Sequence, residues 1–289
     1  MGTLASIDGR LVPPGAARLS IFDRGFLYGD SIYEVFRTYR GHLFEAEAHL
    51  DRLERSGELI GLVLPVPRGL LLARIERTLA ASGNDESYVR LVITRGEGEI
   101  GLDPALARNP HVVVIVRPLA PPPPDVYRDG VEACVVHVRR NLREAVDPAA
   151  KTGNYLNSVL AVREARARGA HEALMLDANG RVTEGSSSNV FAVRAGGLAT
   201  PPLDGILEGV TRRVVLDLAG QLGLPAAETP LGPEDLFAAD ELFLTSTTRE
   251  IVPLVRLDGR AIGSGRPGPV TRRLLAAFRA RAGVAPVDS

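Results

Sequence analysis

One amino group stands out among the side chains of this 289-residue chain. Of its 34 basic residues only Lys151 is a lysine, and the other 33 are arginines. A guanidinium stays charged and is a poor nucleophile, whereas the ε-amine of lysine can lose its proton and condense with a carbonyl group. The composition therefore makes Lys151 a candidate covalent catalyst, the alternative being a surface lysine that survived by chance.

Three further segments carry polar groups that suit a phosphorylated aromatic cofactor. Glu184 precedes a serine run at 186–188 and could keep a pyridine nitrogen protonated, although a polar turn with a solvated glutamate has the same pattern. Residues 209–211 open a predicted helix, whose N–H groups bind an anion or form an ordinary helix start. Residues 245–248 end a predicted strand with hydroxyl groups, which could bind a phosphate or form a plain turn. With the amine, these groups match the needs of pyridoxal phosphate.

The composition excludes several other classes of protein. With 35 acidic residues the net charge is −1, which leaves no electrostatic footprint for nucleic acid or an anionic membrane. The single cysteine, Cys134, excludes an internal disulfide, and the five histidines lack metal-ligand spacing, so we expect no metal. The sequence shows neither a secretory leader nor an apolar run long enough to span a bilayer. We therefore expect a cytoplasmic protein that acts on small molecules.

The hydrophobic pattern predicts an α/β (α+β) protein of two lobes joined by a linker. We expect a small lobe over residues 1–118, a proline-rich linker over 119–126, and a larger β-rich lobe over 127–289 that carries Lys151. Five prolines among residues 118–124 suggest a stiff segment that enters neither a helix nor a central strand. The main predicted helices lie at 46–59, 70–81, 156–168, 211–222 and 270–282. The main predicted strands lie at 32–39, 88–94, 111–116, 131–139, 172–176, 189–193, 198–200 and 241–245.

Seven blocks in order resemble the class IV (fold type IV) pyridoxal-phosphate aminotransferases, the family of branched-chain and D-amino-acid aminotransferases. They are Tyr28-Gly29-Asp30 with Tyr33-Glu34, His49-Leu50-Asp51-Arg52-Leu53, Tyr88-Val89-Arg90, Lys151 with Asn154-Tyr155-Leu156, Glu184-Gly185 with Asn189, Gly209-Val210-Thr211-Arg212, and Ser246-Thr247. The resemblance implies a homodimer with pyridoxal phosphate in the cleft between the lobes, and Tyr28 or the 96–104 loop lent to the partner subunit.

The resemblance also implies a role for each matching residue. Lys151 would form the Schiff base with the cofactor and then move the proton of the substrate α-carbon. Glu184 would keep the pyridine nitrogen protonated, Tyr155 would contact the phenolic oxygen, and Leu207 would pack on the ring. The phosphate would fall to Arg52, Val210, Thr211 and Thr247. The other implied cofactor-binding residues are Ser188, Asn189, Gly209 and Ser246.

The substrate pocket implied by the resemblance is mixed. Tyr28, Tyr88 and Arg90 resemble the pocket of branched-chain enzymes, in which an arginine binds the distal carboxylate of glutamate. Tyr33, the serines at 186–188 and the segment 245–248, which includes Thr248, resemble D-amino-acid aminotransferases. Arg249 follows this segment, and we expect it to face solvent, the alternative being a carboxylate ligand.

We favour a transaminase that moves an amino group between a branched-chain L-amino acid and a 2-oxo acid such as 2-oxoglutarate or pyruvate. The alternatives are a D-amino-acid or (R)-amine transaminase and, less favoured, an aminodeoxychorismate lyase, since nothing marks a chorismate site. A non-catalytic protein that only binds the cofactor would not need Lys151.

Overall fold

The computed structural model describes residues 2–285 and divides the chain into two compact units. Unit 1 comprises residues 1–120 together with 150–154, and unit 2 comprises residues 121–149 together with 155–289. The short segment 150–154, which contains Lys151, thus groups with unit 1. This differs from the expected boundaries, which placed Lys151 in the lobe that follows the linker.

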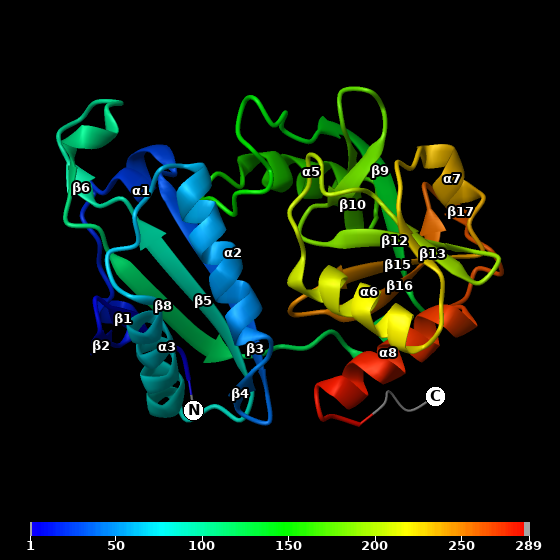
Figure 1. Cartoon of the computed structure of the whole chain (residues 1–289), viewed down its shortest axis with the longest axis horizontal. Coiled ribbons are helices and arrows are strands. Elements are labelled where there is room, and N and C mark those ends of the chain that lie inside the picture. The colour runs from blue at the N-terminus through cyan, green and yellow to red at the C-terminus, as the bar shows by residue number, and fades with distance from the viewer. Residues whose placement is uncertain (1, 286–289) are drawn as a thin grey trace. The chain divides into compact units, whose positions relative to one another are not determined.

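The described part of unit 1 is built on a six-stranded antiparallel sheet in the order β2-β1-β8-β5-β3-β4. Helices α2 and α3 pack on one face of this sheet (Figure 1). Around them lie short elements near the N-terminus and a two-stranded ribbon of β6 and β7. The strands are β1 (Leu4–Ile7), β2 (Arg10–Val12), β3 (Ser31–Tyr39), β4 (His42–Leu43), β5 (Ser87–Thr94), β6 (Glu97–Gly98), β7 (Ala107–Arg108) and β8 (Val112–Pro118). The helices are η1 (Pro14–Ala16), α1 (Arg24–Tyr28), α2 (Ala46–Leu59), α3 (Arg68–Ser82) and η2 (Pro104–Leu106).

The core of unit 1 follows from the two periodicities of its sequence. On β5 the residues Val89, Leu91 and Ile93 alternate with more exposed ones and are fully buried. Helix α2 covers this face with Leu50 and Leu53, which are three residues apart. The predicted helix at 46–59 is thereby confirmed, and the other face of the sheet is left for polar and aromatic side chains.

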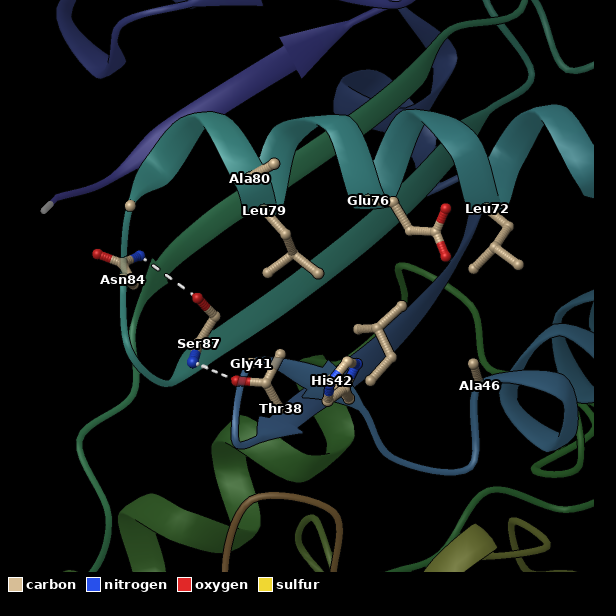
Figure 2. Close-up of a pocket in the computed structure, with 12 residues that line it drawn as sticks. Thr38, Gly41, His42, Ala46, Leu72, Glu76, Leu79, Ala80, Asn84 and Ser87 are labelled. Carbon is tan, nitrogen blue, oxygen red and sulfur yellow. Dashed lines mark hydrogen bonds between the residues drawn. The ribbon is translucent and has the colours of Figure 1, made fainter.

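A groove of about 440 Å³ lies in unit 1 between α3 and the hairpin of β3 and β4 (Figure 2). Leu43, Leu72 and Leu79 give it an apolar lining, and Glu76 extends from α3 beside them. None of the residues that the sequence singles out for chemistry lines this groove.

The described part of unit 2 holds a mixed sheet of nine strands in the order β11-β10-β9-β16-β15-β12-β13-β14, with β17 paired to β16. Helix α5 packs on β9 and β10, whereas α6 and α8 pack on each other and on β15. The strands are β9 (Val131–Arg139), β10 (Glu172–Leu176), β11 (Val182–Gly185), β12 (Asn189–Arg194), β13 (Gly197–Thr200), β14 (Ala226–Glu228), β15 (Glu241–Ser246), β16 (Glu250–Leu257) and β17 (Arg260–Ala261). The helices are α4 (Pro124–Arg128), α5 (Leu156–Ala167), α6 (Val210–Gln221), α7 (Pro233–Phe237) and α8 (Pro269–Arg281).

Two proline-related expectations need correction. Pro118 is the last residue of β8 and Pro124 is the first residue of α4, so the proline segment does enter regular structure. Both positions tolerate proline, because a strand end and the first turn of a helix do not require its missing N–H group. Strand β16 was not predicted, since Pro253 interrupts its apolar run. Its pairing with β9 starts only after this proline, at Leu254.

Cys134 lies in β9 and is buried against α5, as its apolar sequence context predicts. Burial raises the pKa of its thiol. No helix in residues 2–285 is both long and apolar enough to cross a membrane.

Candidate active site

Lys151 is held by its own backbone against strand β3. The peptide N–H of Tyr33 donates to the carbonyl of Lys151 (2.9 Å), and the N–H of Gly153 donates to the carbonyl of Ser31 (2.8 Å). The N–H of Lys151 donates to Oγ of Ser56 on α2 (3.0 Å). These bonds explain why the segment 150–154 groups with unit 1. They also fix the point from which the side chain extends.

The Lys151 side chain is buried and its Nζ lies 4.5 Å from the ring centroid of Tyr33. The guanidinium of Arg90 lies 3.9 Å from the same ring. An aromatic ring attracts a cation at its face, so Tyr33 holds both groups without neutralising either. The only lysine of the chain is thus buried with an aromatic partner and does not lie free on the surface.

Three predicted substrate residues of unit 1 share one face of its sheet. Tyr33 pairs with Val92, and Arg90 pairs with Val35, so these side chains point away from the core that α2 covers. Tyr88 lies two residues before Arg90 on the same face, where the guanidinium of Arg117 stacks on it at 4.6 Å. The structure therefore brings Tyr33, Tyr88 and Arg90 onto one surface.

Tyr28, the fourth predicted substrate residue in unit 1, ends helix α1. Its hydroxyl accepts a hydrogen bond from the N–H of Gly101 (3.1 Å). Arg24 donates to the carbonyl of the same glycine (2.8 Å) and lies 5.0 Å from the Tyr28 ring. Tyr28 and the 96–104 loop are thus linked to each other, as two parts of one surface.

Arg52 forms a buried ion pair that the sequence did not predict. Its Nε and Nη2 donate to the two oxygens of Glu34 at 2.7 and 2.8 Å, a bidentate arrangement. Nδ1 of His49 lies 2.8 Å from the same carboxylate, and all three side chains are buried. Ser56 joins this cluster to the lysine, because its hydroxyl donates to the carbonyl of Arg52 (2.8 Å) and accepts from the N–H of Lys151.

The charges of this cluster follow from its environment. Burial alone would raise the pKa of Glu34, but the charge and hydrogen bonds of Arg52 outweigh it and hold that pKa well below its usual range. Burial lowers the pKa of His49 despite the neighbouring carboxylate. A neutral His49 that donates from Nδ1 carries a lone pair on Nε2, and this buried atom has no hydrogen-bond partner within residues 2–285.

Glu184 lies at the end of β11 in unit 2 and is 6% exposed. Its two oxygens accept from Nε of Arg140 (2.6 Å) and from the N–H of Leu207 (3.2 Å). Arg140 follows β9 and was missed by the sequence analysis, because nothing distinguishes it from the other arginines. This partner provides the charge that a buried carboxylate needs to stay ionised.

Asn189 and Gly209 meet beside Leu207. Nδ2 of Asn189 donates to the carbonyl of Leu207 (3.1 Å), and a Cβ atom at Gly209 would collide with the Asn189 side chain. Helix α6 begins directly after Gly209, and no side chain of the described residues caps its N-terminus. The buried Val210 and Thr211 occupy this first turn. The loop from 207 to 211 therefore joins the Glu184 carboxylate to an uncapped helix N-terminus.

Glu172 is a second buried glutamate of unit 2, and the sequence analysis did not select it. Ser186 donates to it from its hydroxyl and, at 3.2 Å, from its N–H, and Ser188 donates from its hydroxyl at 3.0 Å. Nη2 of Arg249 donates to the same carboxylate at 2.8 Å. The expectation that Arg249 faces solvent is therefore wrong: its side chain is 21% exposed and is paired with a carboxylate.

The remaining predicted residues lie at two chain reversals. Ser246, Thr247 and Thr248 are half-buried at the turn between β15 and β16. The hydroxyl of Ser246 accepts from Nε of Arg249 (3.2 Å). Tyr155 is half-buried and directly precedes α5.

The predicted site residues thus form two sets, each described within its own unit. Unit 1 carries Tyr28, Tyr33, Arg52, Tyr88, Arg90 and Lys151. Unit 2 carries Tyr155, Glu184, Ser188, Asn189, Leu207, Gly209, Val210, Thr211, Ser246, Thr247 and Thr248.

The arrangement of a buried amine, an arginine-paired carboxylate and an uncapped helix N-terminus agrees with what comparison with known proteins finds. The family described as "Amino-transferase class IV" matches residues 31–257. A putative branched-chain-amino-acid aminotransferase of Methanocaldococcus jannaschii is 40% identical over 274 residues, which are 94% of each protein. A D-alanine aminotransferase of Bacillus licheniformis is 33% identical over 273 residues, again 94% of each.

Solved structures are similar over nearly the whole chain. The branched-chain aminotransferase of the archaeon Thermoproteus uzoniensis, solved with norvaline, has a TM-score of 0.91 and 37% identity, covering 98% of this chain and 95% of its own. A branched-chain amino acid aminotransferase of the organism abbreviated T.th., solved with pyridoxamine 5'-phosphate, has a TM-score of 0.94 and 31% identity, covering 99% and 96%.

The chain belongs to the class IV aminotransferases. It has their mixed α/β fold, and it is a pyridoxal-phosphate-dependent enzyme that transfers an amino group between amino acids and oxo acids. The predictions of fold, family, enzyme class and cofactor are confirmed.

Proposed function

We propose that this aminotransferase acts on branched-chain L-amino acids and passes their amino group to a 2-oxo acid such as 2-oxoglutarate or pyruvate, with Lys151 as its catalytic residue. The observation that carries the proposal is the setting of Lys151. The chain's only lysine is buried, its backbone is hydrogen-bonded to β3 and α2, and its amine lies on the ring of Tyr33.

The groups in each unit fit the chemistry of pyridoxal phosphate. An aldehyde requires a primary amine, which only Lys151 provides among the side chains. A phosphate suits the uncapped N-terminus of α6 at Val210 and Thr211, and hydroxyl groups such as those of Ser246 and Thr247. A pyridine N–H suits the carboxylate of Glu184, whose oxygens can accept more than one hydrogen bond. We propose Arg52, Ser188, Asn189, Leu207 and Gly209 as further residues of this binding site.

The bound cofactor supplies an electron sink for the carbanion formed at the substrate α-carbon. We propose that Nζ of Lys151 removes the α-proton and returns a proton after the electrons have moved. The carboxylate of Glu184 holds a proton on the pyridine nitrogen, and Arg140 keeps this carboxylate ionised. Tyr155 donates to the phenolic oxygen. Tyr28, Tyr33, Tyr88, Arg90 and Thr248 are proposed to orient the substrate.

Two findings support the branched-chain substrate over the D-amino-acid alternative. The relatives from M. jannaschii and T. uzoniensis carry branched-chain names at 40% and 37% identity, against 33% for the D-alanine enzyme. The serine run that resembles D-amino-acid enzymes is also occupied in this protein, because Ser186 and Ser188 donate to Glu172 and Ser187 accepts from Arg249. These serines therefore have a structural reason that is independent of substrate handedness.

We also propose that the enzyme is a homodimer. In unit 1 the side chains of Phe26, Ile100 and Leu102 are 73–81% exposed, and hydrogen bonds link α1 to the loop that carries the last two. In unit 2 the exposed Leu156 and Val159 lie three residues apart on α5. Apolar surfaces of this kind are typical of subunit interfaces. The prediction of a cytoplasmic location stays a prediction from the sequence.

The unique lysine permits a direct test of the catalytic residue. Borohydride reduction of the purified enzyme in the presence of pyridoxal phosphate should fix one cofactor per chain, and peptide mapping should place it on Lys151. Lys151→Arg keeps the charge but removes the amine. We expect this variant to fold, to give no reduced adduct, and to transaminate at least roughly 10²–10⁴-fold more slowly.

A matched control and a substrate test complete the experiment. Arg128→Gln changes an exposed residue of α4 and should label and turn over like the wild type. The cofactor absorbance band should convert to that of the amine form with L-leucine and not with D-alanine. Conversion by D-alanine alone would transfer the assignment to the D-amino-acid class, and turnover by Lys151→Arg would overturn the role of the lysine.

A further inference from the structure

The turn between β15 and β16 is held by an unusual number of side-chain contacts. Its three loop residues, Thr247, Thr248 and Arg249, are followed by Glu250, which begins β16 in the left-handed conformation with φ 60°. Glycine is the usual residue at this position of a three-residue hairpin loop, since a side chain there costs about 1–2 kcal/mol. The protein thus accepts backbone strain at the turn that carries its proposed phosphate ligands.

Two consecutive residues tie this turn to other elements of unit 2. Glu250 accepts from Nε of Arg279 on α8 at 2.8 Å, and the hydroxyl of Tyr127 donates to the carbonyl of Arg249 at 3.2 Å. The Arg249 side chain extends the other way, to Glu172 on β10 at 2.8 Å and to the hydroxyl of Ser187 at 3.2 Å. The turn is therefore fixed both from α8 and from the sheet.

Arg249 also joins the turn to the loop that follows Glu184. Its Nε donates to Ser246 at 3.2 Å, while its Nη2 bonds to Ser187 and to the carboxylate that Ser186 and Ser188 also contact. One guanidinium thus spans from the turn at 246–249 to the serines at 186–188. These two segments carry proposed phosphate-binding and cofactor-binding residues respectively.

We propose that Arg249 is a positioning residue for cofactor phosphate, acting through its ion pair with Glu172. The pair holds the backbone and hydroxyl groups of Ser246 and Thr247 in place, so that they need not be ordered when the phosphate arrives. Arg249 itself does not bind substrate, because Glu172 is 2% exposed and requires its charge. This inference rests on the proposed function, in which Ser246 and Thr247 bind the phosphate.

The test compares two forms of the cofactor that differ only in the phosphate. The dissociation constants of pyridoxal 5'-phosphate and of pyridoxal are measured by absorbance titration of cofactor-depleted enzyme, for the wild type, Arg249→Gln, Glu172→Gln and the double variant. We expect each single variant to weaken binding of the phosphate form about 10-fold, the worth of a misplaced hydrogen bond to a charged group. Binding of pyridoxal should not change.

The double variant separates positioning from simple charge balance. It leaves no buried charge unpaired, so its melting temperature should return toward that of the wild type while its affinity for the phosphate form stays low. Arg256→Gln, which removes an exposed ion pair with Glu132 elsewhere on β16, should bind both forms like the wild type.

Three outcomes would overturn the inference. They are unchanged affinity for the phosphate form in Arg249→Gln, an equal loss for both forms, and full recovery of affinity in the double variant. A wild-type enzyme that binds neither form would instead refute the proposed function, and this defect would be visible before any variant is compared.

Discussion

Two buried glutamate–arginine pairs, one in each unit, use the same chemistry for different ends. Glu34 and Arg52 lie on β3 and α2, pair in bidentate fashion, and are both almost fully buried. Glu172 lies on β10, but its partner Arg249 lies in a turn and is 21% exposed. In the first pair the carboxylate orients an arginine that is itself a proposed phosphate ligand. In the second pair the arginine holds a backbone segment whose neighbours are the proposed ligands.

This difference predicts unequal costs when each carboxylate is neutralised. Glu34→Gln leaves the guanidinium of Arg52 buried without its counter-charge, beside a His49 that is already neutral. Breaking a buried pair from one side costs about 3–5 kcal/mol. We expect this loss in the free energy of unfolding, measured by urea denaturation of the variant and the wild type. A loss below that of Glu172→Gln would contradict the comparison.

The pH dependence of stability should sharpen the comparison further. Burial would raise the pKa of Glu172, but the charge of Arg249 and the hydrogen bonds of Ser186 lower it below the ordinary 4.5. Its ionised form therefore stabilises the fold fully above about pH 4.5, and this contribution is lost as the pH falls through the lower pKa of the folded state. We expect the melting temperature of Glu172→Gln to fall less steeply between pH 5 and 3 than that of the wild type, because glutamine does not titrate. Equal slopes would show that the pair contributes nothing to acid stability.

The smallest effect is expected at an ion-pair cluster on the surface. Arg68 contacts Glu47, Asp51 and Glu54, whose side chains are 73%, 45% and 38% exposed. Solvent and salt screen such pairs, so Arg68→Gln should cost at most about 1 kcal/mol of unfolding free energy. Denaturation at low and high salt checks this, since any difference from the wild type should shrink in high salt. A larger cost than that of Glu34→Gln would mean that exposure does not rank these interactions.

The sequence predicted the elements that have a strong local signal. The helix at 46–59 and the strands at 131–139 and 172–176 have the predicted bounds, because apolar spacing fixes which face is buried. Strand β16 escaped prediction, since proline within an apolar run normally argues against a strand. The grouping of residues 150–154 with unit 1 also escaped, because it depends on hydrogen bonds to residues more than 90 positions away.

For the candidate site, the sequence located the amine and the ligands that carry a family motif. It did not find the charges that hold them. Arg140 and Glu172 lie outside every motif, and one arginine among 33 gives no local sign that it will meet a glutamate. Glu34 and His49 do lie within the family blocks, but only the fold reveals that they meet at Arg52. Pairing of distant charges is a property of tertiary structure, which periodicity and spacing do not encode.

The excursion of residues 150–154 also governs how this enzyme can be divided. A fragment that starts at residue 121 would retain Lys151, Glu184 and the N-terminus of α6, and so would appear to hold the essential chemistry. It would lack the strand and helix whose Ser31, Tyr33 and Ser56 bond to the segment around the lysine. The amine would then sit on an unsupported loop. Catalytic competence in this protein is therefore a property of the uncut chain, and exchange of lobes between relatives has to carry the 150–154 segment together with the N-terminal partner that it pairs with.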